Sequence, residues 1–294
     1  MLVAVALSGG VDSSVAALLL RARSLPLVGA SHLVWPGARC CAPEAMDRAR
    51  ALCGLLGIPY LQVDMQAEFR AEVVEDFVRA YRAGRTPNPC VRCNRAMRFD
   101  AFHARLGAEL RAQGLLVADE PLTLATGHYA RVLRDADGWH IEKGRDPAKD
   151  QSYMLHQVRR EMLPHILLPL GDRRKTEVLA LARRQGLPAA SAPESQDACF
   201  VGKSYVEFIR ALLPELSEEE LLRPGAIVDL EGNELGRHAG TLHYTVGQRR
   251  GLGLGSGPWY VSRIEPERGR VVVARREQAQ VPGFAVGGLN WFSE

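Results

Sequence analysis

The stretch LVAVALSGGVDSSVAALLLR, residues 2–21, decides the fold. Residues 2–7 form an uninterrupted apolar run, which is typical of a strand buried on both faces of a parallel sheet. Gly9 and Gly10 then provide a tight turn, and apolar residues at helical spacing resume at Val11. The stretch therefore predicts a buried strand, a glycine turn and a helix over residues 11–23.

The rest of the first half repeats this alternation of strand-like runs and amphipathic stretches. Such a pattern is typical of an α/β fold in which helices cover both faces of a parallel sheet. Further strands are predicted at residues 27–33, 60–63 and 122–126, helices at residues 43–56, 69–81 and 176–185, and a hairpin at residues 130–143.

The composition of the chain changes after Phe200. Two short helices are predicted at residues 204–213 and 218–222, and the sequence then becomes rich in glycine and strand-like. We expect a catalytic domain over residues 1–200, a small α+β domain over residues 201–273, and the start of a further β-barrel region in residues 274–294.

The loop SGGVDSS, residues 8–14, combines two glycines with three hydroxyl side chains. The glycines let the backbone approach an anion, and the following helix N-terminus offers N–H groups and the positive end of a dipole. The loop is not a Walker A motif, because the Gly-Lys-Ser at residues 202–204 has Asp197 where the first glycine should be. A dinucleotide fingerprint is also absent from the loop, so we predict a phosphate cradle rather than a plain strand-to-helix turn.

Six cysteines in a chain of this composition favour thiol or metal chemistry over a disulfide scaffold. Cys90 and Cys93 form a Cys-x-x-Cys motif, and such a pair can ligate a metal, act as a redox couple, or place one thiolate beside another. Cys199 is a distant partner that could complete a three-thiolate site for an iron–sulfur cluster. Of the others, Cys53 falls on an apolar helix face and is predicted to be core, and Cys40 and Cys41 stay open.

Charge and hydropathy exclude some classes of protein. The 294 residues carry 37 basic and 34 acidic side chains, and a net charge of +3 is too balanced to indicate nucleic-acid binding by itself. Most basic residues are arginine, which suits phosphate and base contacts but is equally explained by a GC-rich genome. No run approaches the roughly 20 apolar residues of a membrane span. Without a basic leader or cleavage site, we expect a cytoplasmic protein with no membrane partner.

Three further groups of polar residues lie at predicted strand ends or in loops. His128 directly follows a predicted strand, where functional residues of open α/β sheets lie, although a lone histidine is more often structural. Lys149, Asp150 and Gln151 would by themselves indicate a solvated helix start. Residues 245–253 form a basic, glycine-rich loop that suits phosphates, although composition alone indicates a solvated turn nearly as well.

Together these motifs resemble the bacterial tRNA-specific 2-thiouridylase family over almost the whole chain. The resemblance is carried by residues 8–14, 84–89 with Cys93 and Asn94, 126–130, 149–153, Ser195 with Cys199 and Phe200, and 245–253. Each motif is moderately specific alone, and six in the family's order are very specific. The resemblance implies the PP-loop α/β fold of ATP pyrophosphatases. It also implies an enzyme that adenylates C2 of the wobble uridine of tRNA and then transfers sulfur, giving 2-thiouridine, AMP and pyrophosphate.

The resemblance assigns roles to individual residues. It implies ATP binding by Ala6, Leu7, Ser8, Gly9, Gly10, Val11, Asp12, Ser13 and Gly127. It implies contacts with the target base or the tRNA by Asn88, Pro89, Cys90, His128, Lys149, Asp150 and Gln151. Cys199 would accept sulfur as a persulfide, and Cys93 would attack that persulfide or release sulfide from it. Mg²⁺ would accompany the ATP phosphates, and a cysteine desulfurase or a sulfur relay protein would donate sulfur.

Two departures from the family pattern concern the chemistry and the length. Many members have aspartate where this chain has Cys90, and the thiol favours a 4Fe–4S cluster held by Cys90, Cys93 and Cys199 as the alternative to a persulfide-only route. The chain also stops about where the family's C-terminal barrel begins. A short variant and a partner that supplies the missing surface are both open.

Two other functions remain open from the sequence. One is another PP-loop ligase or sulfurtransferase that adenylates a small metabolite. The Cys93 and Cys199 pair disfavours it, because amide-forming relatives need no sulfur-carrying thiols. The other is a non-catalytic RNA-binding iron–sulfur protein, which the intact loop of residues 8–14 disfavours.

Overall fold

The computed structural model describes residues 1–192, 198–202, 204–279, 283 and 285–292. For Cys40, within the first of these ranges, it describes the backbone but not the side chain. The chain divides into two compact units. The first contains Met1–Val73, Pro89–Phe200 and Leu289–Glu294, and the second contains Val74–Asn88 and Val201–Gly288. The segment Val74–Asn88 therefore belongs to the second unit although it interrupts the first in sequence. No sequence motif indicates that this segment packs with residues 201–288.

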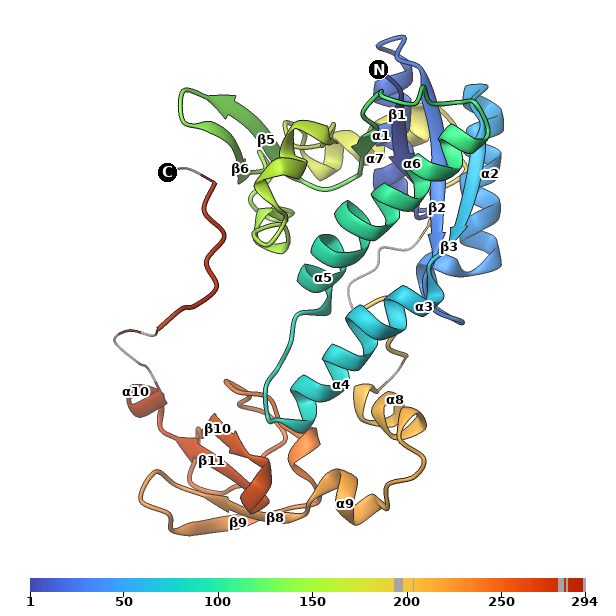
Figure 1. Cartoon of the computed structure of the whole chain (residues 1–294). Helices are drawn as coiled ribbons and strands as arrows, with labels where there is room; N and C mark the ends of the chain where they lie inside the picture. Colours follow the sequence, from blue (N-terminus) through green and yellow to red (C-terminus); the bar gives the residue numbers. More distant parts are fainter. Residues whose placement is uncertain (193–197, 203, 280–282, 284, 293–294) are drawn as a thin grey trace. The chain divides into compact units, whose positions relative to one another are not determined.

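The first unit is built on a parallel sheet with the strand order β3-β2-β1-β4-β7 (Figure 1). Its strands are β1 (Val3–Ala6), β2 (Leu27–Leu33), β3 (Tyr60–Asp64), β4 (Thr123–Ala125) and β7 (Ile166–Leu167). In the central strand β1, Val3 pairs with Leu27 on one side and Thr123 on the other. The strand order runs outward from β1 in one direction to β3 and then in the other direction from β4 to β7, so β1 and β4 flank a topological switch point. Ligands of open α/β sheets bind at the carboxyl ends of the strands at such a point.

Helices cover both faces of this sheet, as the fold class predicted from the sequence requires. Val3 and Val5 of β1 belong to a core cluster with residues of three helices, α1 (Val11–Arg21), α2 (Pro43–Leu56) and α7 (Lys175–Arg184). Ala4 lies between them on the opposite face and is also fully buried. None of the described helices is long and apolar enough to cross a membrane.

A long helical segment covers that second face. It runs without a break through α5 (Pro89–Arg92), the π-helical η3 (Cys93–Phe102) and α6 (His103–Ala112). The ring of Phe102 lies 5.0 Å from that of His32 on β2. The turn-forming residues Asn88, Pro89 and Asn94 flank the Cys-x-x-Cys motif in sequence, yet the motif lies within this helical segment. Pro89 gives the reason, since proline at the first helical position presets φ and costs no hydrogen bond.

The remaining elements of the first unit follow the predicted order. The helix predicted at residues 69–81 is formed by α3 (Gln66–Phe69), the π-helical η2 (Arg70–Val74) and α4 (Glu75–Arg82), of which α4 lies in the second unit. The predicted hairpin consists of β5 (Ala130–Asp135) and β6 (Gly138–Lys143). Three short 3-10 helices belong to the same unit, η1 (Arg39–Cys41), η4 (Ser152–Met154) and η5 (Arg160–His165).

The second unit is a small α+β domain with a four-stranded sheet in the order β10-β11-β8-β9. The strands are β8 (Gly225–Val228), β9 (Glu234–His238), β10 (Tyr260–Glu265) and β11 (Arg270–Ala274). Its other elements are α8 (Tyr205–Leu212), α9 (Glu218–Leu222), η6 (Thr241–His243), η7 (Pro266–Arg268) and α10 (Arg276–Ala279). Helix α4 packs on α8, where the rings of Tyr81 and Tyr205 stack with centroids 4.5 Å apart.

Candidate active site

Two glycines shape the loop at the end of β1. Gly9 has a φ of +67°, and a Cβ there would lie 2.2 Å from the carbonyl oxygen of Ala45. Gly127 follows β4, and a Cβ on it would lie 2.7 Å from the backbone nitrogen of Ser13. Both positions therefore require glycine. The switch point of the sheet thus brings the predicted phosphate loop and Gly127 together.

Hydrogen bonds within the loop fix its shape. The Ser13 hydroxyl donates to the Gly10 carbonyl at 3.0 Å and accepts from the backbone nitrogen of Ser8 at 3.3 Å. The Ser14 hydroxyl also donates to the Gly10 carbonyl, at 2.9 Å. Gly10 is the N-cap of α1 and supplies no side-chain cap, so the first-turn N–H groups of α1 receive no capping oxygen. This arrangement is suited to an anion in front of the helix.

Asp12 lies in the first turn of α1, where an uncompensated carboxylate would repel phosphates. Its two oxygens each lie 2.8 Å from Nζ of Lys175, and the Tyr129 hydroxyl donates to Oδ1 at 2.8 Å. Lys175 begins α7 and is only 7% exposed, whereas the Asp12 side chain is 33% exposed. The ammonium therefore neutralises Asp12 beside the loop. Lys175 was not indicated by the sequence, where its only signal is that it is one of four lysines.

The other residues expected to bind ATP lie around this loop. Ala6 ends β1, and both it and Leu7 are buried. The Leu7 carbonyl accepts from the Ser31 hydroxyl at 2.7 Å, which anchors the end of the strand to β2. Val11 begins α1 and packs in the core. These three residues therefore support the loop from the sheet and the core beneath it.

The helical segment α5–η3 carries two of the predicted sulfur-site cysteines. Cys90 is in α5 and Cys93 is the first residue of η3, so a spacing of three residues places both on one side of the helix. Cys199 lies on another segment, where its carbonyl accepts from the backbone nitrogen of Arg39 at 3.1 Å. The charge of Cys199 acts on both Cys90 and Cys93, so the three thiols form one electrostatic group.

Burial and one arginine control the ionisation of the helical thiols. Desolvation raises the pKa of Cys93 to about 12, and the Arg98 guanidinium opposes that rise. Desolvation also raises the pKa of Cys90, the charge of Cys199 adds to the effect, and Arg98 opposes it. Cys93 is therefore a neutral thiol near pH 7, and Arg98 is the cation that stabilises its thiolate. Arg98 was not indicated by the sequence.

The remaining cysteines separate into a core residue and one more neighbour of the thiols. Cys53 is 1% exposed in the α2 core, as predicted, and burial raises its pKa to about 11. The charge of Cys41 also acts on Cys93. The Cys41 sulfur accepts from the Val34 nitrogen at 3.2 Å and donates to the His32 carbonyl at 3.5 Å. The side chain of Cys40 and the motif residue Ser195 lie outside what the structure describes.

His128 connects the end of β4 to the cysteine helix. Arg98 Nη1 donates to Asn94 Oδ1 at 2.6 Å and to His128 Nε2 at 3.3 Å. Because a guanidinium only donates, Nδ1 carries the ring proton and donates it to Thr126 Oγ1 at 2.6 Å. Desolvation, with a smaller effect of Arg98, lowers the pKa of His128 to about 3. His128 is therefore a neutral imidazole at neutral pH.

Residues 149–151, expected to contact tRNA, are tied to neighbouring backbone. The Gln151 nitrogen donates to the Tyr129 carbonyl at 2.9 Å, and Gln151 Oε1 accepts from the Tyr129 nitrogen at 3.0 Å. Burial opposes ionisation of Asp150, but hydrogen bonds from Gly144 and Ser152 lower its pKa overall. The Lys149 nitrogen donates to the Asp146 carbonyl at 3.1 Å. These residues therefore hold Tyr129 and the end of the hairpin in place.

The expected contacts with the target base lie where the long helical segment begins. Asn88 is exposed, Pro89 is the first residue of α5, and Cys90 follows it. Within the part of the chain that the structure describes, no group of three or more His, Cys, Asp or Glu residues could hold a metal ion. Cys90, Cys93 and Cys199 form one electrostatic group, and the cluster ligand set expected from the sequence stays a prediction.

Known families match most of the chain. A family described as "tRNA methyl transferase HUP domain" matches residues 1–203, and one described as "tRNA methyl transferase PRC-barrel domain" matches residues 214–275. The tRNA-specific 2-thiouridylase MnmA of Acidithiobacillus ferrooxidans is 42% identical over 294 residues, which cover 99% of this chain and 79% of that protein. The protein of the same description from Chloroflexus aggregans is 45% identical over 302 residues, covering 99% and 80%.

Similarity to solved structures is distant. The NMN synthetase of Francisella tularensis has a TM-score of 0.41 at 16% identity and covers 74% of this chain and 78% of that chain. The U34-tRNA thiolase NcsA of Methanococcus maripaludis, solved with its [4Fe-4S] cluster, has a TM-score of 0.38 at 20% identity and covers 74% and 66%. The assignment of the chain to a family therefore rests on the sequence relatives, which match nearly the whole chain.

Proposed function

Because the chain belongs to the tRNA-specific 2-thiouridylase family and is an ATP-dependent tRNA sulfurtransferase, we propose how its residues divide the reaction. The ATP phosphates occupy the loop of residues 8–13 and Gly127, in front of α1. The C2 oxygen of the wobble uridine attacks the α-phosphorus, and pyrophosphate leaves. First-turn N–H groups and serine hydroxyls stabilise the charge on the phosphates.

The single observation that carries the proposal is the connection made by Gly127 and His128. Gly127 approaches Ser13 of the phosphate loop so closely that a Cβ would lie 2.7 Å from its nitrogen. The next residue, His128, is within 3.3 Å of Arg98 on the cysteine helix. Two consecutive residues at one strand end therefore join the nucleotide loop to the sulfur chemistry.

In this scheme Mg²⁺ would bind together with ATP. Asp12 is the only acidic side chain of the loop in residues 8–14, and both its oxygens face Lys175. The phosphate oxygens of ATP would therefore hold the ion. When bound, Mg²⁺ would neutralise part of the charge on the leaving pyrophosphate.

Sulfur transfer uses Cys199 and Cys93. A sulfur donor, such as a cysteine desulfurase or a relay protein, leaves a persulfide on Cys199. The terminal sulfur attacks C2 of the adenylated uridine, and AMP leaves with the C2–O electron pair. The Cys93 thiolate, stabilised by Arg98, then attacks Cys199 Sγ, and the S–S bond breaks with sulfur left on the base. A Cys93–Cys199 disulfide results, which a cellular dithiol reduces before the next turnover.

The residues proposed to contact tRNA lie near the phosphate loop and the cysteines. Asn88, Pro89 and Cys90 lie near the target base at the start of the long helical segment. His128 contributes a neutral ring, and Lys149, Asp150 and Gln151 hold the neighbouring backbone. Sulfur passes through Cys199 and Cys93 in this scheme, and a cluster held by Cys90, Cys93 and Cys199 is the alternative route.

A two-step assay tests this division. Pyrophosphate release that depends on tRNA reports adenylation, and retardation of the tRNA in a mercury gel reports sulfur. We expect Cys199→Ala to retain the first step and lose the second. Cys53→Ala is the control, because Cys53 is a buried thiol of the α2 core.

The alternatives give different results. Pyrophosphate release without any need for tRNA would indicate a small-metabolite ligase, and no release at all would indicate a non-catalytic RNA-binding protein. If Cys199→Ala thiolates tRNA at the normal rate, the persulfide route is wrong.

A further inference from the structure

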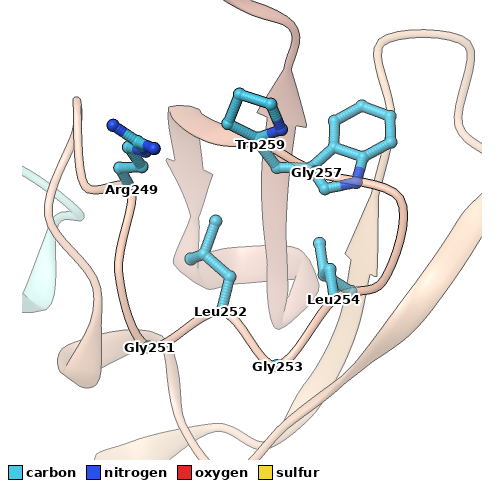
Figure 2. A pocket seen from close by; sticks show the side chains of 8 residues that line it. Arg249, Gly251, Leu252, Gly253, Leu254, Gly257 and Trp259 are labelled. Carbon is cyan, nitrogen blue, oxygen red and sulfur yellow. The ribbon is translucent and has the colours of Figure 1, made fainter.

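A pocket of about 340 Å³ lies within the second unit, at the turn that leads into β10 (Figure 2). It is lined by Arg249, Gly251, Leu252, Gly253, Leu254, Gly257, Pro258 and Trp259. Its volume falls at the lower end of the roughly 300–1,000 Å³ range of small-ligand pockets. The pocket therefore fits a single ring system rather than an extended ligand.

The floor of the pocket belongs to the hydrophobic core of the unit. Leu252 is 7% exposed and is a member of the core cluster, and Leu254 and Trp259 pack against that cluster. The Gly247 nitrogen donates to the Val261 carbonyl at 2.8 Å and ties the preceding loop to β10. The pocket is thus formed before any ligand enters, which lowers the entropic cost of binding.

Trp259 is held in one orientation by two contacts. Its indole nitrogen donates to the Gly255 carbonyl at 3.1 Å. The guanidinium of Arg275 lies 3.8 Å from the centre of the indole ring, and Arg275 also donates to the Ser256 carbonyl. A fixed aromatic plane backed by a cation suits a flat, electron-rich ring.

The charge around the pocket is positive. Arg249 lines it, Arg250 follows in sequence, and both are exposed. None of the eight lining residues is acidic. A ligand that combines a flat ring with a negatively charged neighbour matches this set of groups, and a nucleotide of a single-stranded RNA segment has that combination.

We propose that this pocket binds one unpaired nucleobase of the tRNA substrate, stacked at Trp259, with an adjacent phosphate on Arg249. The proposal rests on the proposed function, because it takes tRNA as the substrate. It adds a base-binding site in the second unit, remote in sequence from the sulfur chemistry. A peptide with an aromatic or proline side chain would fill the apolar part but would leave the arginine without an anion.

Matched variants test the proposal by tRNA affinity at a fixed salt concentration. Arg249→Gln and Arg250→Gln remove the same charge from adjacent exposed positions, but only Arg249 lines the pocket. We expect Arg249→Gln to raise the Kd for tRNA about 5-fold and Arg250→Gln by about 2-fold or less. Trp259→Leu should raise it about 10-fold, and Trp259→Phe should stay near the wild type because an aromatic plane remains.

Abasic tRNAs identify the bound base. Each unpaired nucleotide is replaced in turn by an abasic one, and Kd is measured for the wild type and for Trp259→Leu. We expect one or two positions where the change weakens the wild type about 10-fold but leaves the already weakened variant almost unchanged. Thermal unfolding of each variant shows whether it is folded, and Arg249→Gln gives a result even if Trp259→Leu unfolds.

Two outcomes overturn the proposal. One is an equal effect of Arg249→Gln and Arg250→Gln together with a Trp259→Leu variant that is folded and binds normally. The other is an equal abasic response in the wild type and in Trp259→Leu, which would assign the pocket to a different ligand such as a peptide. Failure of the proposed function looks different, because the wild type would then neither bind nor thiolate tRNA.

Discussion

At the scale of single residues, burial sets the protonation of the groups around Arg98, and the Arg98 charge adjusts it. This charge lowers the pKa of His128 and His32 and opposes the raised pKa of Cys90 and Cys93. The same cation therefore adds to the burial that keeps the imidazoles neutral, and it favours thiolates. Both effects suit sulfur chemistry, which needs a nucleophilic sulfur and no competing acid.

The raised pKa of Cys93 predicts how thiolation depends on pH. Below its pKa of about 12, the thiolate fraction of Cys93 increases about tenfold per pH unit. If Cys93 attack limits the rate, single-turnover thiolation should rise about tenfold per pH unit, and so about 100-fold between about pH 7 and pH 9. Arg98→Met should be slower throughout. Pyrophosphate release, measured in parallel, is the control for adenylation. A thiolation rate that is flat over this range would show that Cys93 is not the rate-limiting nucleophile.

The site residues that could not be predicted from the sequence were missed for one physical reason, which is that tertiary packing creates their contacts. Lys175 and Asp12 are 163 positions apart, and only the packing of α7 against α1 brings them together. Arg98 has no motif of its own, because its role depends on the strand end that its helix packs against. The Cys-x-x-Cys motif and the glycine loop could be recognised in the sequence, since each is a local pattern with its own chemistry. The roles given to Cys93 and Cys199 stay predictions.

At the scale of elements, the junction between β1 and α1 forms the loop that we propose binds the ATP phosphates. The strand is buried on both faces, the turn needs a left-handed glycine, and the helix starts without a side-chain cap. These features are local, so the sequence predicted this junction well. The helix over α5 and η3 was missed, because turn-forming residues flank its start and hide the helical pattern.

The two glycines of the loop should respond differently to alanine. Gly9→Ala forces a left-handed φ and a Cβ 2.2 Å from the Ala45 carbonyl oxygen, whereas a Cβ on Gly10 would be 3.4 Å from the Ser8 hydroxyl. Gly10 has a φ of −92°, which any residue adopts. We expect Gly9→Ala to lower ATP-dependent pyrophosphate release more than 100-fold, about 3 kcal/mol, and Gly10→Ala by less than about 10-fold. Similar losses for both would mean that backbone conformation is not what the loop requires.

At the scale of the whole molecule, the chain passes between its two units more than once. Val74–Asn88 joins the second unit, and Leu289–Glu294 returns to the first. The return is anchored by the Asn290 side-chain amide, whose nitrogen donates to the carbonyls of His156 at 3.0 Å and Val158 at 2.7 Å. Such contacts between distant parts of the chain leave no pattern in the local sequence.

Asn290 should contribute measurably to the stability of the first unit. Asn290→Ala removes two hydrogen bonds to main-chain carbonyls, and we expect a loss of about 1 kcal/mol in the free energy of unfolding. Trp291→Ala is the matched control, because Trp291 is 69% exposed and should change stability by less than about 0.5 kcal/mol. Urea unfolding followed by circular dichroism measures both. Equal effects of the two variants would show that the anchoring hydrogen bonds do not stabilise the unit.

The ion pair between Asp12 and the buried Lys175 also has a practical consequence for chemical footprinting. Lysine occurs at only four positions, 143, 149, 175 and 203, so amine-reactive reagents have few targets in this arginine-rich chain. Lys175 is 7% exposed, and its ammonium contacts both oxygens of Asp12. We therefore expect Lys175 to resist labelling while the loop of residues 8–14 keeps its structure. Labelling of Lys175 would report that the loop has lost it.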